Sequence, residues 1–450
     1  MAQPKTLPLV LVEEGALGAA GLDRRTAQWA AATGFAGQRG RLLPLPAEAG
    51  GLAGYLFGTG PAGDRPVLVA GLAAAALEPG RYRLDGAVGD PTYAALGFRL
   101  GAYRFDRYKA GKAAPELVLP KGADAAEVAR LADAAYLARD LVNTPPNDLG
   151  PVAFEAAIRA FAKARRMTVR AVVGDELLEQ NFPMIHAVGR ASAEAPRLLD
   201  LSWGRAGDPR VTLVGKGVTF DTGGLDIKSA AGMLLMKKDM GGAANVLGLA
   251  HAIIDAKLKV RLRVLLPVVE NAISGAAFRP GDILPSRAGQ TVEIGNTDAE
   301  GRLILADALA LADEEKPALL VDMATLTGAA RIALGPELPP LYATDDALAA
   351  ALVAAGRAAD DPLWHMPLWA PYETMLASKV ADVNHVTSAN FAGSVTAALF
   401  LKRFVRRAGA WVHLDIYAWA PEARAGRPVG GTDQGIRAVY GVLKARYGAQ

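Results

Sequence analysis

The stretch GGAANVLGLAHAIIDAKLKVRLRVLLPVV, residues 241–269, joins an apolar helix pattern to an apolar strand pattern. Its first part is rich in alanine and leucine and predicts a helix, and its second part, rich in valine and leucine, predicts a buried strand. Further strand patterns flank it at residues 167–173, 197–203, 210–218 and 318–324. Because strands alternate with long helices, we expect a mixed, largely parallel sheet with helices on both faces.

The first part of the chain, roughly residues 1–120, has a different texture. Short apolar runs separated by Ala-rich stretches predict strands at residues 7–12, 65–71 and 116–120. Asp90 and Pro91 are typical of a helix start, since aspartate caps free amides and proline fits the first turn. This alternation predicts a smaller N-terminal α/β domain.

A helix pattern from Asp124 connects the two parts. Asp124 and Glu127 have the spacing of a capping box, and the prolines at 145 and 146 end the helix. One face of it is apolar and consists of Val128, Leu131, Ala135, Ala138 and Leu141. We therefore expect an N-terminal domain over 1–125, a connecting helix over 126–150 and a larger domain over 151–450.

Composition narrows the classes of function. The 450 residues include no cysteine, which excludes disulfides and thiolate nucleophiles and leaves oxygen or nitrogen to hold any metal. The net charge is only +3 and basic residues are dispersed, so a nucleic-acid partner is not expected. No long uncharged apolar run occurs, and the N-terminus does not match a signal peptide. We expect a cytoplasmic protein without a membrane partner.

Polar motifs that follow predicted strands are the candidates for a site, because sites in open sheets lie beyond the carboxyl ends of the strands. Three glycine-containing motifs qualify: GKGVTFDTGGLDIKS (215–229), KKDMGGAAN (237–245), which follows the run MLLM (233–236), and TVEIGNTDAEGRL (291–303). They carry Lys216, Asp221 and Lys228, then Asp239, and finally Asp298, Glu300 and Arg302.

Four carboxylates in one site need compensating charge. Two carboxylates about 4 Å apart repel by about 4 kcal/mol at an effective dielectric of 20, and two divalent ions balance four such groups. Taken singly, each of these charged residues is more typical of a solvated loop, and the glycines are more typical of turns. The glycines do not have the spacing of a phosphate-binding loop. Together, three charged motifs after three predicted strands favour a metal site.

The string NTDAEGRL (296–303), with the two other motifs, resembles the leucyl aminopeptidase family, the cytosol aminopeptidases, which are dizinc exopeptidases. Matching continues through VNTPPND (142–148), AVGRAS (187–192), ATLTGA (324–329), SVTAALFL (394–401) and WVHLDI (411–416). The resemblance covers residues 140 to 450, and it implies that the larger domain is a dimetal peptidase domain. In the N-terminal domain only GAYRFDRYK (101–109) is similar.

The resemblance implies a role for each motif residue. The family's metal-ligand positions correspond to Lys216, Asp221, Asp239, Asp298 and Glu300, with Asp221 and Glu300 bridging two ions. Lysine ligates as the neutral amine, which a neighbouring divalent ion permits. Zinc or manganese is expected, and oxygen-rich ligation also tolerates magnesium or cobalt. Lys228 and Arg302 fall on the catalytic positions.

The resemblance also implies the reaction. A hydroxide that bridges the ions attacks the N-terminal peptide bond of peptides with a free α-amine, while Lys228 stabilises the oxyanion. Arginine has no proton to give at neutral pH, so Arg302 cannot itself be the base. The resemblance implies that Arg302 instead holds a bicarbonate that shuttles the proton, at a helix start that suits an anion. The family forms homohexamers with the catalytic domains inward. Two alternatives stay open: a dimetal hydrolase acting on another amide or a phosphoester, and a catalytically idle interaction protein.

The pocket for the substrate's N-terminal side chain departs from the family. Met236, Thr325 and Gly328 match positions that line it, but Tyr417 stands where typical members have small residues. If the ring points inward it fills space that leucine would occupy, so we predict a preference for smaller or more polar N-terminal residues. The alternative is that Tyr417 packs in the core. The five histidines lack metal-ligand spacing, and we interpret them as structural.

Overall fold

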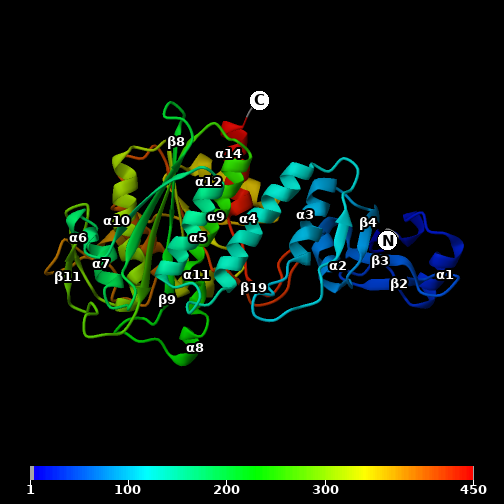
Figure 1. The fold of residues 1–450 in the computed structure, drawn as a ribbon, viewed down its shortest axis with the longest axis horizontal. Coiled ribbons are helices and arrows are strands. Elements are labelled where there is room, and N and C mark those ends of the chain that lie inside the picture. The colour runs from blue at the N-terminus through cyan, green and yellow to red at the C-terminus, as the bar shows by residue number, and fades with distance from the viewer. Residues whose placement is uncertain (1–4, 449–450) are drawn as a thin grey trace. The chain divides into compact units, whose positions relative to one another are not determined.

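The computed structural model describes residues 5–448 (Figure 1). Contacts divide the chain into two compact units, Met1–Tyr136 with Ala420–Val429, and Leu137–Trp419 with Gly430–Gln450. The division falls inside helix α4 (Ala125–Asn143). The sequence patterns do not indicate that residues 420–429 join the N-terminal unit. We keep the division at 1–125, 126–150 and 151–450 as a proposal.

The N-terminal unit contains a five-stranded sheet in the order β2-β3-β1-β4-β5. Only β2 and β3 pair antiparallel, and the other neighbours are parallel. The strands are β1 (Thr6–Glu13), β2 (Leu42–Pro46), β3 (Leu52–Gly60), β4 (Arg81–Gly86) and β5 (Glu116–Val118). The helices are α1 (Arg24–Ala32), α2 (Ala70–Ala76) and α3 (Pro91–Ala102), so the smaller α/β unit is confirmed.

One predicted strand in this unit is wrong. Residues 65–71 form turns and the start of α2 instead. A Cβ on Gly101 of α3 would lie 2.0 Å from the Gly71 carbonyl oxygen, so the two helices approach too closely for any side chain there. This close packing of α2 on α3 explains why the apolar segment is helical.

The predicted caps and helix face match the structure. The Asp90 carboxylate accepts hydrogen bonds from the Thr92 and Tyr93 amides at the start of α3. Asp124 accepts one from the Glu127 amide, and α4 ends at Asn143, before the two prolines. Its predicted apolar face is buried along its whole length. Local sequence therefore fixes both helix starts.

The larger unit is built on a nine-stranded sheet in the order β15-β14-β17-β13-β8-β10-β7-β6, with β9 also paired to β10. The strands are β6 (Thr168–Val173), β7 (Arg197–Trp203), β8 (Arg210–Gly215), β9 (Gly217–Asp221), β10 (Arg261–Asn271), β13 (Leu319–Ala324), β14 (Pro340–Ala343), β15 (Trp364–His365) and β17 (Trp411–Asp415). Its centre is parallel, while β7 with both of its neighbours, and β14 with β17, pair antiparallel. The predicted mixed, largely parallel sheet is confirmed.

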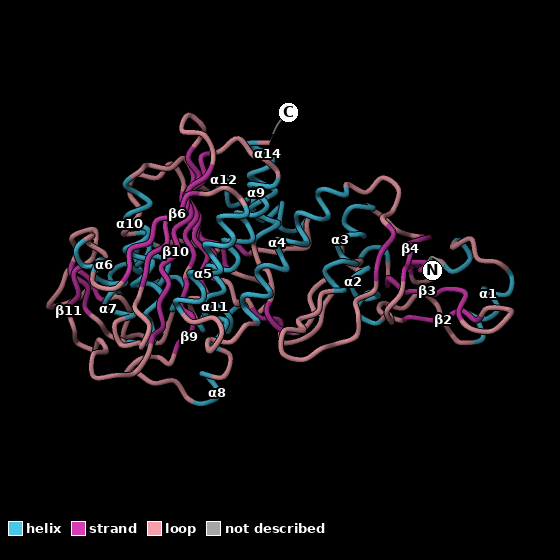
Figure 2. Tube along the Cα trace, in the orientation of Figure 1, coloured by secondary structure: helices cyan, strands magenta, loops and turns pink. Residues whose placement is uncertain are grey.

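Helices cover both sides of this sheet (Figure 2). Helices α7 (Pro183–Gly189), α10 (Glu300–Glu314) and α13 (Gly393–Lys402) share one apolar core with the strands. Helices α9 (Gly241–Asp255), α12 (Asp346–Ala358) and α14 (Ile436–Tyr447) pack together elsewhere on the sheet. The remaining helices are α5 (Pro151–Ala164), α6 (Glu176–Glu179), α8 (Ala230–Met233) and α11 (Gly328–Leu334).

Two site motifs follow elements other than main-sheet strands. The run MLLM does not form a strand, because it ends α8 and leads into a 3-10 helix, η3 (Met236–Met240). β12 (Thr291–Glu293) is a strand, but it lies in a separate three-stranded sheet with β11 (Ile283–Pro285) and β16 (Val383–Asn384). No helix among the described residues is long and apolar enough to span a membrane.

Candidate metal centre and active site

Asp221 is held at the end of β9 by its neighbours. One of its carboxylate oxygens, Oδ1, accepts hydrogen bonds from the Gly223 amide and from Nδ2 of Asn271, both at 2.8 Å. Asn271 ends β10 and pairs with Asp221 in the sheet. Gly223 has φ of 88°, a left-handed conformation in which glycine carries no penalty. Asp221 is therefore positioned by both strand and turn.

A second loop meets the first through Thr297. Its hydroxyl donates to the Gly223 carbonyl oxygen at 2.7 Å, and its amide donates to the Asp226 carboxylate, also at 2.7 Å. Asn296 accepts from the Asp298 amide and opens the 3-10 turn η4 (Thr297–Ala299) that leads into α10. These bonds fix the backbone that carries Asp298 and Glu300. The sequence analysis did not single out Thr297, Asp226 or Asn271.

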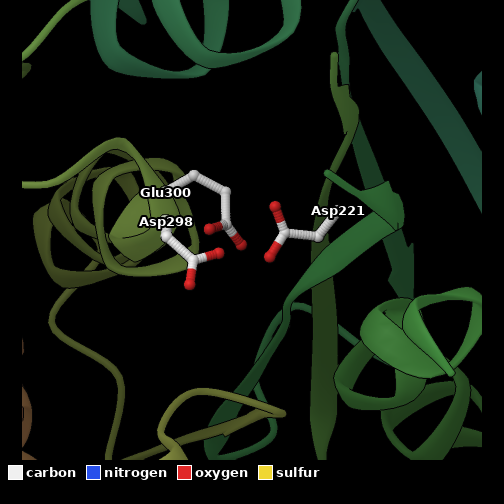
Figure 3. Close-up of side chains that lie close together, drawn as sticks. All are labelled: Asp221, Asp298 and Glu300. Atoms are coloured by element: carbon white, nitrogen blue, oxygen red, sulfur yellow. The ribbon is translucent and has the colours of Figure 1, made fainter. Parts of the chain in front are cut away.

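The two loops bring three carboxylates together. Asp221, Asp298 and Glu300 each offer an oxygen, and these oxygens all lie within 4.8 Å of one another. Figure 3 shows Asp298, in η4, and Glu300, at the start of α10, facing Asp221 on β9. Asp221 and Glu300 are buried, whereas Asp298 is partly exposed. Oxygen atoms at this spacing suit a metal ion.

Lys216 joins Asp239 to this cluster. Its Nζ lies 2.8 Å from an Asp239 oxygen and 2.9 Å from a Glu300 oxygen, and it donates to the Thr325 carbonyl oxygen at 3.0 Å. A Cβ at Gly301 would lie 2.5 Å from Cε of the lysine, so only glycine lets this side chain lie against α10.

Lys228 lies on the opposite side of the Asp221 carboxylate. Its Nζ is 2.8 Å from Oδ2 of Asp221, and it also contacts the Asp298 carboxylate. Burial alone would lower the pKa of Lys228, but Asp221 above all raises it beyond the ordinary value. The side chain is therefore an ammonium donor at neutral pH.

The acids of the cluster have shifted pKa values. Burial, together with the nearby Asp221 and Asp239 carboxylates, raises the pKa of Glu300 to about 8. Burial and Asp239 raise the pKa of Asp221 to about 6. Burial opposes ionisation of Asp239 as well, but Lys216 and Lys238 outweigh it and lower its pKa. The four acids outnumber the two lysines, and the raised pKa values of Glu300 and Asp221 are the consequence of burial together with that unbalanced charge.

These residues fit divalent metal ions. Three carboxylate oxygens, one each on Asp239, Asp298 and Glu300, accept no hydrogen bond from residues 5–448 and face only lysine ammonium groups. A buried carboxylate oxygen is normally satisfied by hydrogen bonds, so these three oxygens are suited to bind further cations. Hard oxygen ligands in this number favour a divalent ion.

Arg302 lies in the first turn of α10 and is buried. Its guanidinium donates to the His385 carbonyl oxygen at 2.7 Å, while Nε finds no hydrogen-bond acceptor among the described residues. Burial lowers the pKa of Arg302 to about 10, so it stays charged at neutral pH. Burial lowers the pKa of His385 to about 3, so its ring is neutral; its Nδ1 accepts from the Gly295 amide, and its Nε2 donates to the Asn296 carbonyl oxygen at 2.9 Å.

A cavity of about 430 Å³ opens beside the cluster. It is lined by most of the predicted residues, namely Lys216, Asp221, Lys228, Met236, Asp239, Asp298, Thr325, Gly328 and Tyr417. Glu300 and Arg302 are not among its lining residues, because both side chains are buried. Lys238 and Arg331 also line it, and the sequence analysis did not identify them. None of the five histidines lines this cavity.

A larger cavity, about 900 Å³, lies in the N-terminal unit beside Trp29 and Glu48. It contains none of the motif residues. The carboxylates, lysines and unsatisfied oxygens are all gathered at the smaller cavity, so chemistry rather than volume identifies the site.

Comparison with known proteins agrees with this arrangement. A family model described as "Cytosol aminopeptidase family, catalytic domain" matches residues 136–440, and one described as "M17 aminopeptidase, N-terminal domain" matches residues 7–120. A probable cytosol aminopeptidase of Roseiflexus castenholzii is 43% identical over 77% of this chain and 75% of its own length. Another, of Methylorubrum populi, is 41% identical over 86% and 83%.

Solved structures show the same fold. The crystal structure of a cytosol aminopeptidase from Coxiella burnetii is 45% identical, with a TM-score of 0.93 over 99% of this chain and 98% of that one. The bottromycin maturation enzyme BotP, solved in complex with Mn, is 36% identical with a TM-score of 0.89 over 98% and 99%. The chain therefore belongs to the M17 cytosol aminopeptidase family and is a leucyl-aminopeptidase-like metalloexopeptidase.

Proposed function

We propose that the chain removes the N-terminal residue from peptides with a free α-amine, using two divalent ions. The proposed ligands are Lys216, Asp221, Asp239, Asp298 and Glu300. The observation that carries this proposal is the buried cluster of Asp221, Asp298 and Glu300, whose oxygens lie within 4.8 Å of one another beside an open cavity. When bound, the two ions polarise the scissile carbonyl, lower the pKa of a water and hold the α-amine.

Lys216 is the proposed ligand whose protonation must change. Burial favours its neutral form, but Asp239, Glu300 and Asp221 outweigh burial and raise its pKa above the ordinary value. A lysine can ligate a metal only as the neutral amine, so binding has to release this proton. Thr325 accepts a hydrogen bond from the amine through its carbonyl oxygen, which keeps the side chain directed at the cluster.

Lys228 is the proposed stabiliser of the oxyanion. It is protonated, it lines the cavity, and Asp221 and Asp298 hold its Nζ beside the cluster. An ammonium group placed in advance stabilises charge that develops on the carbonyl oxygen without reorganising at the moment of reaction.

Arg302 is proposed to hold bicarbonate as the proton shuttle. It is charged, its Nε–H has no hydrogen-bond acceptor among residues 5–448, and it lies in the first turn of α10, where free amides favour an anion. The His385 carbonyl oxygen fixes one of its terminal nitrogens and so orients the guanidinium plane.

Zinc or manganese is the proposed metal, with magnesium or cobalt as substitutes, because the ligands are mostly carboxylate oxygens. The Mn bound in BotP supports a divalent ion at this fold. We propose in addition a cytoplasmic location, in keeping with the names of the curated relatives. A homohexamer is proposed from the family resemblance alone.

A panel of amino-acid amides and dipeptides, free and N-acetylated, tests this function with and without a chelator. We expect hydrolysis only of substrates with a free α-amine, and only with divalent metal present. Asp239→Ala and Glu300→Ala should abolish turnover by removing a ligand. Full turnover by thoroughly metal-free enzyme, or equal hydrolysis of N-acetylated substrates, would contradict the proposal and favour a different hydrolase. Intact ligand positions argue against an idle interaction protein.

A further inference from the structure

Two cations lie against the ring of Tyr417 at the cavity. Nζ of Lys238 is 4.6 Å from the ring centre, and Cζ of Arg331 is 5.2 Å from it. They come from different elements, since Lys238 is in η3 and Arg331 is in α11. All three residues line the same cavity as the carboxylate cluster. The ring thus holds two positive groups on one wall.

Neither cation forms a direct ion pair with an acid of the described chain. Among residues 5–448 the structure records no hydrogen bond or ion pair for either side chain, although Lys238 is only 5% exposed. Contact with an aromatic face is weaker than the hydration that a buried ammonium loses. A buried amine of this kind that lines a cavity is arranged to meet an acceptor that enters the cavity.

The acids nearest to these cations are already engaged. Asp239 contacts Lys216 and accepts from the Thr325 hydroxyl at 2.8 Å. Asp415 accepts hydrogen bonds from the Leu326 and Thr327 amides and from the Thr327 hydroxyl. Both carboxylates favour the charged form of Lys238 from a distance, but neither forms an ion pair with Lys238 or Arg331 among the described residues. The charge that completes this wall has to arrive with the substrate.

We propose that the pocket selects peptides whose N-terminal residue has a carboxylate side chain, aspartate or glutamate, which Lys238 and Arg331 bind together. This inference rests on the proposed aminopeptidase function and names its substrate class. The cations adjoin Met236, Thr325 and Gly328, the residues predicted to line the pocket for the N-terminal side chain, and all five line one cavity. The C-terminal carboxylate of a peptide substrate is the other carboxylate that Lys238 and Arg331 could bind, but it extends away from that pocket.

The test compares the amides of glutamate, glutamine and leucine on the metal-loaded enzyme. An amide substrate has no C-terminal carboxylate, and glutamine has the shape of glutamate without its charge. We expect kcat/KM for the glutamate amide to exceed that for glutamine by about tenfold or more. Lys238→Met should lower this ratio by about tenfold, and Lys238→Arg should restore part of it. Arg331→Gln, at an exposed position, gives a second measurement of the same ratio.

Lys237→Met is the matched control. Lys237 neighbours Lys238 on η3, but its Nζ donates to the Asn143 carbonyl oxygen and it does not line the cavity. This variant should leave the glutamate-to-glutamine ratio unchanged. The leucine amide distinguishes failure of this inference from failure of the proposed function. If the enzyme hydrolyses the leucine amide but shows no preference for the glutamate amide, this inference is overturned and the aminopeptidase function stands.

Two further outcomes overturn the proposal. One is an unchanged glutamate-to-glutamine ratio in both Lys238→Met and Arg331→Gln. The other outcome concerns Leu-Gly and Leu-Gly amide, which differ only in the C-terminal carboxylate. If the two variants reduce the preference for Leu-Gly over Leu-Gly amide but leave the glutamate-to-glutamine ratio unchanged, the cations bind the peptide's C-terminus instead.

Discussion

Lys228 and Lys216 both lie among carboxylates at the cavity, but Lys228 is the more exposed, with 15% of its side chain accessible against 4% for Lys216. The difference in exposure fits the proposed roles of Lys228 as a hydrogen-bond donor to the substrate and of Lys216 as a buried metal ligand. We expect Lys228→Ala to raise the barrier to turnover by about 2 to 4 kcal/mol, the usual cost of losing one oxyanion donor. Steady-state kinetics with saturating metal measures this loss as a lower kcat.

Metal content is the control for that prediction. Because Lys228 is not a proposed ligand, the Lys228→Ala protein should retain about two ions per chain, as the proposed site requires. Loss of metal together with activity would instead make Lys228 a structural part of the metal site. Arg302→Ala should lower turnover less and recover with added bicarbonate.

Tyr417 lines the cavity rather than packing wholly in the core, and its ring is half-buried. Tyr417→Ala should enlarge the pocket and raise kcat/KM for leucyl over alanyl substrates, since each methylene that a pocket accepts is worth about 1 to 3 kcal/mol. The measurement is that ratio in both enzymes. An unchanged ratio would show that the ring does not limit the pocket.

The charged residues that lie in short motifs could be predicted from the sequence, because η4 and the first turn of α10 fix Asp298, Glu300 and Arg302 relative to one another. Sequence analysis did not find Thr297 and Asp226, whose hydrogen bond joins positions 71 residues apart. Lys238 and Arg331 were missed for a related reason: a shared contact with the Tyr417 ring leaves no trace in spacing along the chain. Short motifs therefore predict the proposed metal ligands, whereas the residues that contact them from distant parts of the chain are seen only in the folded structure.

At the scale of elements, buried acids satisfy backbone amides of distant segments. Asp307 on α10 accepts from the Met184 and Ile185 amides at the start of α7, which has no side-chain cap of its own. Asp361 likewise accepts from amides at the start of α14. Each acid joins two elements and places hydrogen-bond acceptors at a helix N-terminus.

Asp307→Asn tests how much this support contributes. The second oxygen of Asp307 accepts from the Arg287 amide at 2.9 Å, so the asparagine amide group would set a donor against a donor at one of the three bonds. We expect a loss of about 1 to 3 kcal/mol in the free energy of unfolding. Denaturant unfolding monitored by circular dichroism measures it.

Glu314→Gln is the control for that variant. Glu314 lies on α10, as Asp307 does, and it pairs with Arg287, but its side chain is 48% exposed. An exposed ion pair contributes about 0 to 1 kcal/mol, so this substitution should have a small effect. Equal losses in the two variants would show that the buried acid is no more important than a surface charge.

Elements were predicted best where one periodic pattern runs through them, as in β8, β10 and α9. The run at 233–236 failed because its apolar residues were taken for a strand, whereas the Ser229 hydroxyl accepts from the Gly232 amide and starts α8. Four apolar residues in a row do not distinguish a short helix from a strand. The separate sheet containing β12 also lay beyond pattern analysis, because its partner β16 comes about ninety residues later.

At the scale of the whole larger unit, the proposed metal site draws its residues from segments that are distant in sequence, among them the end of β9, the 3-10 helix η3 and the start of α10. Without metal, the raised pKa values of Asp221 and Glu300 mean that the folded protein binds protons that the unfolded chain releases. For such acids the stabilising contribution is complete below the ordinary pKa and is lost as pH rises through the folded value. Between about pH 6 and 8 the metal-free fold should therefore weaken.

Metal reverses this trend, because its ligands must be deprotonated and binding to the folded state adds directly to stability. We expect the difference in Tm between protein with Mn²⁺ and protein with a chelator to widen from pH 6 to pH 8. Differential scanning calorimetry at a fixed free Mn²⁺ concentration measures it. In Glu300→Gln, which lacks the group with the pKa of about 8, the difference should be small and vary little with pH. A constant difference in the unmodified protein would mean that metal binding displaces no protons, and that the charges of the cluster are already balanced before the ions enter.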